Sequence, residues 1–347
     1  MQTFPSITVT GDARARGAAH GEAFRGLIRA ALDLYLQGLF AQPSRNHIDL
    51  SAGAAEAEAA IVRFAPDIAA EISGIARGAN LPPWQVFLLN ARTEILNSKE
   101  PECTAFYLKD SAVLAQNWDW IKELEDLCVV IEHEPDDGLR YIAFGEAGMV
   151  GKIGLNERGV GVGLNILFAP HPISGLPVHP LTQAVLRATD LAQACEVVRN
   201  SGVGKASHIL IGDGAGNCRG FEFMGDARHE VEARNGYLLH TNHCIAPAAK
   251  DVLEDLGTTK ARYACAKSKL DNAAVLNCEL ARDLLDEREI GDGVLNRPYL
   301  EAQALKPYLV GTCATVVMEL NEARLSIRKG PLGESEGEGR AFSHFSL

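Results

Sequence analysis

The spacing of apolar residues changes near residue 103, and this change constrains the fold more than any other feature of the chain. Residues 11–96 carry apolar side chains at helical spacing. Beyond residue 103 the chain becomes a series of short apolar or alternating runs separated by turn residues, which is typical of a strand meander. Helical spacing returns at 180–200 and 253–290, and strand-like runs follow each time. Separate strand and helix blocks favour an α+β layered fold over a regular βαβ alternation.

Local signals divide the helical and strand blocks further. An Ala-rich run predicts a helical segment that is interrupted at Pro66 and stops at Gly-Ala-Asn. A further helix is expected at 81–96, with prolines near its start. The runs at 313–320 and 324–330 predict a hairpin, and the polar segment 333–340 predicts a loose tail.

Size and charge exclude several classes of protein. The chain has 347 residues, 47% of them hydrophobic, so it can form one large domain or two ordinary ones. Its net charge of -12 would repel a phosphate backbone, which argues against nucleic acid as a partner. The N-terminus has no basic start followed by an apolar stretch, and no window approaches the roughly 18 apolar residues of a membrane span. We therefore expect a cytoplasmic protein without a membrane partner.

The cysteines and the glycine-rich segments carry no recognisable binding motif. Eight cysteines occur without a CxxC pair, so reduced, mostly buried thiols are expected in place of a zinc ribbon or a redox motif. "GEAGMVGKI" resembles a phosphate-binding loop, but Gly145 and Gly151 are one residue too far apart and Ile153 replaces the hydroxyl residue. "GVGVGLN" and "GDGAGN" miss the dinucleotide spacing. We expect these glycines to form strand turns and tight sheet contacts.

Cys103 stands at the junction of the helical and strand halves. The polar stretch "NSKEPE" precedes it, and "TAF", which can enter a sheet directly, follows it. This arrangement suits a chain that is cut just before its nucleophile. Attack of the thiol on the Glu102 carbonyl would form a thioester, and hydrolysis would release Cys103 as a new N-terminus. The freed amine has an ordinary pKa of about 7.7–8.0, so one residue would supply both nucleophile and base.

Several segments, in order along almost the whole chain, resemble the isopenicillin N acyltransferase family of N-terminal-nucleophile (Ntn) hydrolases. These segments are "RGAAHGEAF", "LLNARTEI", "ECTAF...AQNWDW", "AGMVGKIGLNERGVGVGLN", "LLHTNH" and "VVMEL...RLSIRKGPLG". The resemblance implies a four-layer αββα sandwich, in which two antiparallel sheets are stacked and helices lie outside them. It also implies a helical segment 1–102 that stays bound as an α chain after self-cleavage, and a catalytic β chain 103–347.

The resemblance also implies site residues. Cys103 matches the nucleophile and cleavage site, and Asp119 matches the carboxylate that orients the new amine and thiol. Asn242 matches the oxyanion amide, and Arg262 resembles an arginine that holds the amine or a carboxylate. Asn117 lies two residues before Asp119, so on an alternating strand both would point to one face and could line the same site.

Each of these residues has an ordinary structural alternative. Asp119 and Asn117 could cap turns, and Arg262 could be a solvated helix residue. "HTNHC" places His240, His243 and Cys244 together in a metal-like pattern, but no second ligand cluster completes it, so we expect no metal. Glu102 precedes the nucleophile, where glycine or another residue is expected in relatives. This difference concerns the rate of self-cleavage more than its chemistry. The order of cysteine, aspartate, asparagine and arginine together favours catalysis.

The expected reaction is acyl transfer through a Cys103 thioester, to water or to an amine, without a cofactor. The partners implied are a small-molecule amide or acyl donor, with acyl-CoA as one option, and the cleaved N-terminal fragment; a homo-oligomer stays open. One alternative is a papain-like cysteine protease, because His240, Asn242 and His243 follow Cys103 by about 140 residues. However, that family's cysteine signature is absent, and its nucleophile lies on a helix. A second alternative is an unprocessed, non-enzymatic binding module on the same scaffold.

Overall fold

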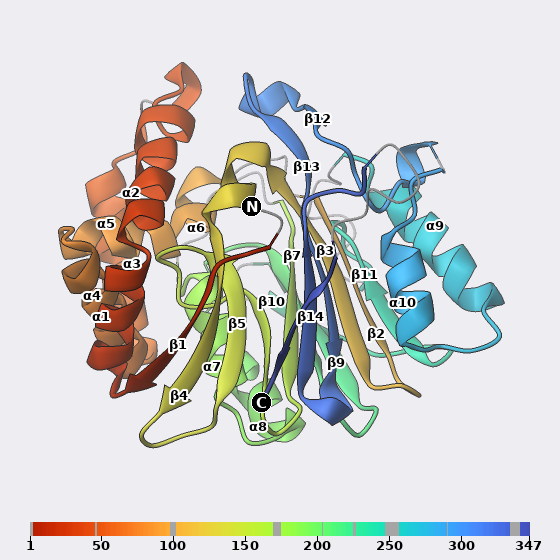
Figure 1. Ribbon diagram of the computed structural model, residues 1–347. Helices are drawn as coiled ribbons and strands as arrows, with labels where there is room; N and C mark the ends of the chain where they lie inside the picture. Colours follow the sequence, from red (N-terminus) through yellow and green to blue (C-terminus); the bar gives the residue numbers. More distant parts are fainter. Residues whose placement is uncertain are drawn as a thin grey trace.

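Two β-sheets lie face to face, and helices cover the outer side of each, so the chain forms four layers (Figure 1). The computed structural model describes residues 3–45, 47–97, 102–168, 175–202, 204–224, 227–246, 257–289, 291–333 and 341–347. The layer order is the αββα sandwich of the α+β class that the sequence predicted. Within these described ranges, no helix is long and apolar enough to cross a membrane.

The N-terminal block is helical as predicted, and its start and stop signals lie where the sequence places them. Pro66 begins α4, and Asn80 caps its C-terminus with a φ of 55°, in the left-handed region. The helices of this block are α1 (Ala13–Ala23), α2 (Arg25–Asp33), the π-helical η1 (Leu34–Leu39), α3 (Leu50–Phe64), α4 (Pro66–Ala79), α5 (Pro83–Asn90) and α6 (Arg92–Leu96).

A strand that the sequence did not predict precedes these helices. Strand β1 (Ser6–Gly11) pairs in parallel with β4 (Cys128–Pro135), and Ser6 lies opposite Val130. The expectation of purely antiparallel sheets was therefore wrong at this edge. Ile7 and Val9 of β1 alternate with the polar residues Thr8 and Thr10, so a short period-two signal was present and was missed.

The first sheet has the strand order β1-β4-β5-β6-β7-β8-β9-β10. From β4 to β10 each strand is antiparallel to the next, as the meander predicts. The helical segment predicted at 180–200 is two helices that cover this sheet. The bounds are β5 (Tyr141–Glu146), β6 (Ile153–Asn156), β7 (Gly161–Ile166), α7 (Val178–Leu186), α8 (Leu191–Arg199), β8 (Ser207–Gly212), β9 (Cys218–Met224) and β10 (Ala227–Val231).

The second sheet has the strand order β11-β2-β3-β13-β14-β15, with β12 paired to β13. The predicted C-terminal hairpin is confirmed as β13–β14, whereas the short strands β12 and β15 were not predicted. Residues 253–256, 290 and 334–340 lie outside the described residues. The bounds are β2 (Glu102–Leu108), β3 (Val113–Ile121), β11 (Tyr237–His240), α9 (Thr259–Asn272), α10 (Cys278–Leu285), β12 (Leu300–Glu301), β13 (Leu309–Glu319), β14 (Arg324–Lys329) and β15 (Ser343–Ser346).

Side chains of β2 alternate between two cores. Ala105 and Tyr107 belong to the large core that includes the space between the sheets. Phe106 and Leu108 belong to a smaller core under α9 and α10. Odd-numbered residues of this strand therefore face the first sheet, and even-numbered residues face the helices.

The glycine-rich segments form turns and close contacts, as predicted. Gly159 and Gly216 have φ values of 76° and 86° in the turns that follow β6 and β8. A Cβ on Gly154 would lie 2.1 Å from the Ile142 carbonyl oxygen of the neighbouring strand. The same requirement governs helix packing, because a Cβ on Gly78 of α4 would lie 2.1 Å from the Ala18 oxygen of α1.

Candidate active site

Cys103 is the second residue of β2, at the end of the strand that follows the helical block. It lies opposite Trp118 of β3, so both side chains share the face toward the first sheet. The residue is 3% exposed in the intact chain. A strand position differs from the helical nucleophile of a papain-like protease, and that alternative therefore loses its structural support.

Hydrogen bonds hold the backbone of Cys103 on both sides. Its N–H donates to Asn242 Oδ1 at 2.7 Å. Its carbonyl oxygen accepts from Arg262 Nη1 at 2.8 Å and from Asn165 Nδ2 at 3.3 Å. Arg262 Nη2 also donates to Asn242 Oδ1 at 2.8 Å, which joins the two sides. The peptide of Cys103 is thus fixed by side chains from β7, α9 and the segment after β11.

Arg262 is fully buried and does not have the solvated position of an ordinary helix arginine. Besides Cys103 and Asn242, it binds the hydroxyl oxygens of Thr104 at 3.0 Å and Thr258 at 3.1 Å. A planar guanidinium can hold several acceptors in fixed directions, which a lysine ammonium does less well. Arg262 therefore orients the first residues of β2 from the helix side of the sheet.

Asp119 lies on β3 opposite Glu102, at the same end of the sheet. Its Oδ1 accepts a hydrogen bond of 2.7 Å from Thr312 Oγ1 of β13. Thr312 Oγ1 in turn accepts from the Arg297 N–H at 2.8 Å. A β-bulge between Thr312 and Ala314 shifts the register at this point, so Thr312 stands directly opposite Asp119.

The electrostatic surroundings of Cys103 oppose ionisation of the thiol in the intact chain. Burial and the negative charge of Asp119 raise the pKa of Cys103 to about 12. The positive charges of Lys152 and Arg262 and a hydrogen bond from the Asp119 backbone act in the other direction. An uncut chain of this kind holds its thiol mostly protonated near neutral pH.

Asn117 shares the face of Asp119, as the alternation predicts, but its amide is engaged elsewhere. Its Nδ2 donates to the carbonyl oxygens of Leu285 at 2.7 Å and Leu295 at 2.8 Å. These contacts tie β3 to the segment around α10. The structure thus brings Cys103, Asp119, Asn242 and Arg262 to one end of the sheet and assigns the Asn117 amide to the helix layer.

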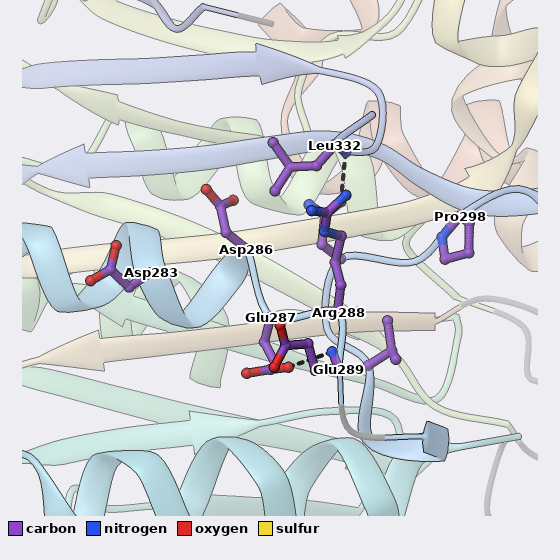
Figure 2. Close-up of a pocket in the computed structure, with 9 residues that line it drawn as sticks. Asp283, Asp286, Glu287, Arg288, Glu289, Pro298 and Leu332 are labelled. Carbon is purple, nitrogen blue, oxygen red and sulfur yellow. Dashed lines mark hydrogen bonds between the residues drawn. The ribbon is translucent and has the colours of Figure 1, made fainter. Parts of the chain in front are cut away.

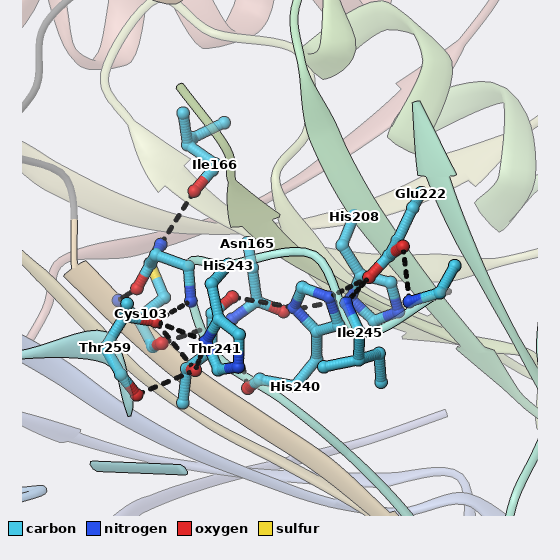
Figure 3. Close-up of polar contacts among 12 residues, drawn as sticks. Cys103, Asn165, Ile166, His208, Glu222, His240, Thr241, His243, Ile245 and Thr259 are labelled. Carbon is cyan, nitrogen blue, oxygen red and sulfur yellow. Dashed lines mark hydrogen bonds and ion pairs between the residues drawn. The ribbon is translucent and has the colours of Figure 1, made fainter. Parts of the chain in front are cut away.

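A buried group of polar side chains adjoins this site (Figure 3). The rings of His208 and His240 stack with centres 3.7 Å apart. His208 Nδ1 lies 3.1 Å from Asn165 Oδ1, and His240 Nε2 lies 2.8 Å from Glu222 Oε1. Glu222 also accepts from the backbone N–H groups of Ile245 and Ala246, in the segment that carries Asn242.

The metal-like pattern in "HTNHC" has ordinary partners. His243 Nδ1 lies 2.9 Å from Thr259 Oγ1, and the same hydroxyl accepts from the Asn242 N–H at 2.7 Å. His240 pairs with Glu222 as described above. No group of three or more potential metal ligands occurs in the part of the chain that the structure describes.

Sequence reasoning did not single out several residues of the site. Asn165 lies within a segment quoted for the family resemblance, but spacing alone did not mark it. Thr259, Thr312 and His208 had no signal, because sheet pairing and helix packing bring them to the site across long sequence separations.

The cavity drawn in Figure 2 is separate from the thiol. It has a volume of about 640 Å³ and lies around the end of α10, and four of its nine lining residues are acidic. Asn296, one of its lining residues, donates to the Leu285 carbonyl that also binds Asn117. The cavity therefore lies on the helix side of β3, whereas the thiol faces the other sheet.

Comparisons with known proteins agree with the resemblance seen in the sequence. Residues 108–330 match the family described as acyl-coenzyme A:6-aminopenicillanic acid acyl-transferase. The 40 kDa form of acyl-coenzyme A:6-aminopenicillanic-acid-acyltransferase from Emericella nidulans is 31% identical over 260 residues, covering 71% of this chain and 72% of the relative.

Two solved structures are similar at low sequence identity. A mutant of conjugated bile acid hydrolase from Clostridium perfringens has a TM-score of 0.49 and 11% identity, covering 71% of this chain and 97% of that chain. The Caenorhabditis elegans ortholog of N-acylethanolamine-hydrolyzing acid amidase has a TM-score of 0.47 and 13% identity, covering 71% of this chain and 99% of that chain. The family match extends over more than half of the sequence, and the chain therefore belongs to the acyl-coenzyme A:6-aminopenicillanic acid acyltransferase family.

Proposed function

We propose that this chain is a self-processing Ntn enzyme that transfers an acyl group from a small amide or acyl donor through a Cys103 thioester. The observation that carries the proposal is the fixed peptide of Cys103. Asn242 holds its N–H at 2.7 Å, and Arg262 holds its carbonyl oxygen at 2.8 Å. The polar side chains that the family resemblance assigns to catalysis thus converge on the residue with the thiol.

Self-cleavage begins with attack of the Cys103 sulfur on the carbonyl carbon of Glu102. The C–N bond between the two residues breaks, and the nitrogen takes up the thiol proton and becomes the amine of Cys103. Water then hydrolyses the thioester and leaves a carboxylate on Glu102 and a free thiol on Cys103. The products are an α chain of residues 1–102 and a β chain of residues 103–347.

The new amine serves as the base in turnover. Asn242 Oδ1 already accepts from this nitrogen in the intact chain, and Asp119 stands at the same strand end. An amine with a pKa near neutrality can take the proton of the thiol and pass it to the leaving group. The acyl-enzyme then reacts with water or with an acceptor amine, and no metal or organic cofactor enters the reaction.

Side-chain amides stabilise the oxyanion that forms at the substrate carbonyl. Asn242 is the donor expected from the sequence, and we propose Asn165 as a second, because its Nδ2 lies 3.3 Å from the backbone oxygen of Cys103 and thus close to the nucleophile. In the intact chain Asn242 Nδ2 donates to the Ile166 carbonyl at 2.8 Å, so the Asn242 amide must turn or share this donor. One such donor typically contributes about 2.7–4 kcal/mol.

The burial of Cys103 supports a precursor that is inactive before cleavage. The residue is 3% exposed, and its thiol pKa is raised in the intact chain. The eight cysteines are all free in the structure, in keeping with the proposed cytoplasmic location. Acyl-CoA is the acyl donor named for the curated relative, and it is one candidate donor here, beside linear amides that would be hydrolysed.

The test compares the wild-type chain with Cys103→Ala and with the control Cys195→Ala on α8. Mass analysis of the purified proteins should find fragments 1–102 and 103–347 in the wild type and the control, and an intact chain in Cys103→Ala. Only the cleaved proteins should turn over a panel of N-acyl amides or acyl-CoA with and without an added amine. An active wild type with the bond between residues 102 and 103 intact would overturn the proposal. An intact chain whose Cys103 ignores thiol reagents would instead favour the binding module.

A further inference from the structure

Two buried cations share one buried carboxylate near the active-site face of the first sheet. Lys152 is 4% exposed, Arg92 is 5% exposed and Glu146 is 1% exposed. Lys152 Nζ lies 3.2 Å from Glu146 Oε1, and Arg92 binds the same oxygen. Tyr35 donates to the other oxygen at 2.7 Å. With a neutral tyrosine, this group carries one positive charge in excess.

Other titratable groups beside these residues do not supply the missing negative charge. Burial lowers the pKa of His179 well below its ordinary value, so this ring is neutral. Burial raises the pKa of Glu94, near Arg92, to about 7, so it is only partly ionised at neutral pH. The thiols of Cys128, Cys103 and Cys313 also interact with Lys152. Burial raises the pKa of the Cys128 thiol well above its ordinary value, and it raises the pKa of the Cys313 thiol as well.

The excess charge lies next to the nucleophile. Lys152 Nζ is 3.4 Å from the centre of the Trp118 ring, over its face. Trp118 is the cross-strand partner of Cys103, and directly opposed side chains have Cβ atoms about 4.5–5.5 Å apart. The ammonium is therefore held by an aromatic ring and a carboxylate beside the thiol, on the same face of the second sheet.

Burial of a net positive charge is unfavourable unless an anion forms close to it. Burial accordingly lowers the pKa of Lys152 to about 8, although Glu146 acts to raise it. The effect between lysine and thiol is mutual, since Lys152 lowers the pKa of Cys103 and a Cys103 thiolate raises that of Lys152. A thiolate on Cys103 would supply the negative charge that the group lacks.

We infer that Lys152 is a positioning residue of the reaction, which acts as the counter-ion of the Cys103 thiolate from its place over Trp118. The inference rests on the proposed function, which makes Cys103 the nucleophile. Its role is electrostatic: it increases the fraction of thiolate at a given pH, while Asp119 and the amine direct the proton. Above the Lys152 pKa the ammonium loses its proton, and this support for the thiolate is lost.

The test measures the rate at which iodoacetamide alkylates Cys103 as a function of pH, by peptide mass spectrometry. Lys152→Met removes the charge and keeps the apolar stem, whereas Lys152→Arg keeps a charge that does not titrate. Lys329→Met is the matched control. Lys329 is also buried, pairs with the Asp126 carboxylate and lies over the Phe4 ring. It is on β14, two strands away from Trp118 of β3, and therefore farther from Cys103.

Lys152→Met should raise the apparent pKa of the Cys103 thiol by about one unit, which is a tenfold loss of thiolate below that pKa. A more basic thiolate is a better nucleophile by about threefold per unit, so the alkylation rate should fall about threefold. Lys152→Arg should restore the rate and remove the inflection near the Lys152 pKa. Lys329→Met should match the wild type.

An unchanged Cys103 profile in Lys152→Met would overturn the inference. If that variant does not fold, Lys152→Arg still decides, because the wild-type inflection must disappear when the charge no longer titrates. The alkylation profile requires neither self-cleavage nor turnover. A chain that fails to cleave itself but shows these shifts would refute the proposed function, while the electrostatic pairing of Lys152 with the Cys103 thiolate would still hold.

Discussion

The contact between Thr312 and Asp119 offers a sharp test of how the proposed active site is held. Thr312→Val keeps the shape of the side chain and removes the hydroxyl. The change deletes the 2.7 Å bond to Asp119 and leaves the Arg297 N–H without the acceptor it finds at 2.8 Å. A hydrogen bond to a charged group is worth about 1.5–3 kcal/mol, and a buried donor without a partner costs about 1–3 kcal/mol. Because the Arg297 N–H is only partly buried, the lost bond to Asp119 dominates, and we expect a loss of about 1.5–3 kcal/mol in the free energy of unfolding.

The matched control lies on the same strand. Thr315→Val removes a hydroxyl that accepts from Arg328 at 3.2 Å; its cross-strand neighbour is Asn117, whose amide is engaged by the helix layer, and not Asp119. Urea unfolding followed by tryptophan fluorescence gives the stability of each variant, and the time course of chain cleavage gives its activity. Both variants should lose stability. Only Thr312→Val should slow cleavage and turnover, by about 10- to 100-fold, which corresponds to about 1.4–2.7 kcal/mol of transition-state stabilisation.

The refuting result is specific. If Thr312→Val cleaves itself and turns over substrate at the wild-type rate while it shows the expected loss of stability, the hydroxyl serves the fold alone. Asp119 would then either need no orientation or take no part in the reaction. Equal losses of activity in both threonine variants would also refute the reasoning, because the effect would follow stability alone.

Two further predictions concern the fold. Burial opposes ionisation of Glu146, but Arg92 and Lys152 outweigh this effect and hold the pKa of Glu146 at about 2, below its ordinary 4.5. The ionised carboxylate should therefore stabilise the folded chain above pH 4.5, and this contribution should be lost as the pH falls toward 2. Urea unfolding at several pH values should show that the free energy of unfolding falls by about 3 kcal/mol across this range, and this fall should be absent in Glu146→Gln. If the variant shows the same dependence on pH as the wild type, Glu146 is not its source. Gly78→Ala should lose at least about 1–3 kcal/mol, because its Cβ would lie 2.1 Å from the Ala18 oxygen. A Cβ on Gly26 would have no neighbouring atom within 4 Å, so Gly26→Ala should instead gain up to about 1 kcal/mol in stability, measured by thermal unfolding. Similar losses of stability in the two glycine variants would reject the steric explanation.

The sequence predicted the layered fold because most of its elements carry a local signal. The strands from β2 to β9 are apolar runs bounded by turn residues, and Pro66 and Asn80 mark the ends of helices by their backbone preferences. β1 escaped prediction although Ile7 and Val9 alternate with polar residues, because the run is short and stands alone before a long helical block. Its partner β4 lies more than 100 residues away, so no nearby pattern announces the pairing.

The site was predicted less completely, for a physical reason. Cys103, Asp119 and Asn242 lie in the segments quoted for the resemblance, whereas Arg262 was matched outside them, and the structure brings all four to one strand end. Thr312 reaches Asp119 through a bulge in β13, which has no signature in the residues alone. The alternation of β3 correctly placed Asn117 and Asp119 on one face, but it could not indicate that α10 would engage the Asn117 amide.

The parallel pairing of β1 with β4 determines what the two pieces could do after the proposed cut. Residues 6–11 hydrogen-bond along a strand that belongs to the other piece, so the first piece completes the rim of the eight-stranded sheet. Synthesis of residues 103–347 alone would leave β4 with an unpaired row of amides and carbonyls, a surface on which foreign strands can assemble. The two fragments should therefore be obtained in folded form only when the whole chain folds before it is cut. Fragments that are produced separately and then mixed should aggregate.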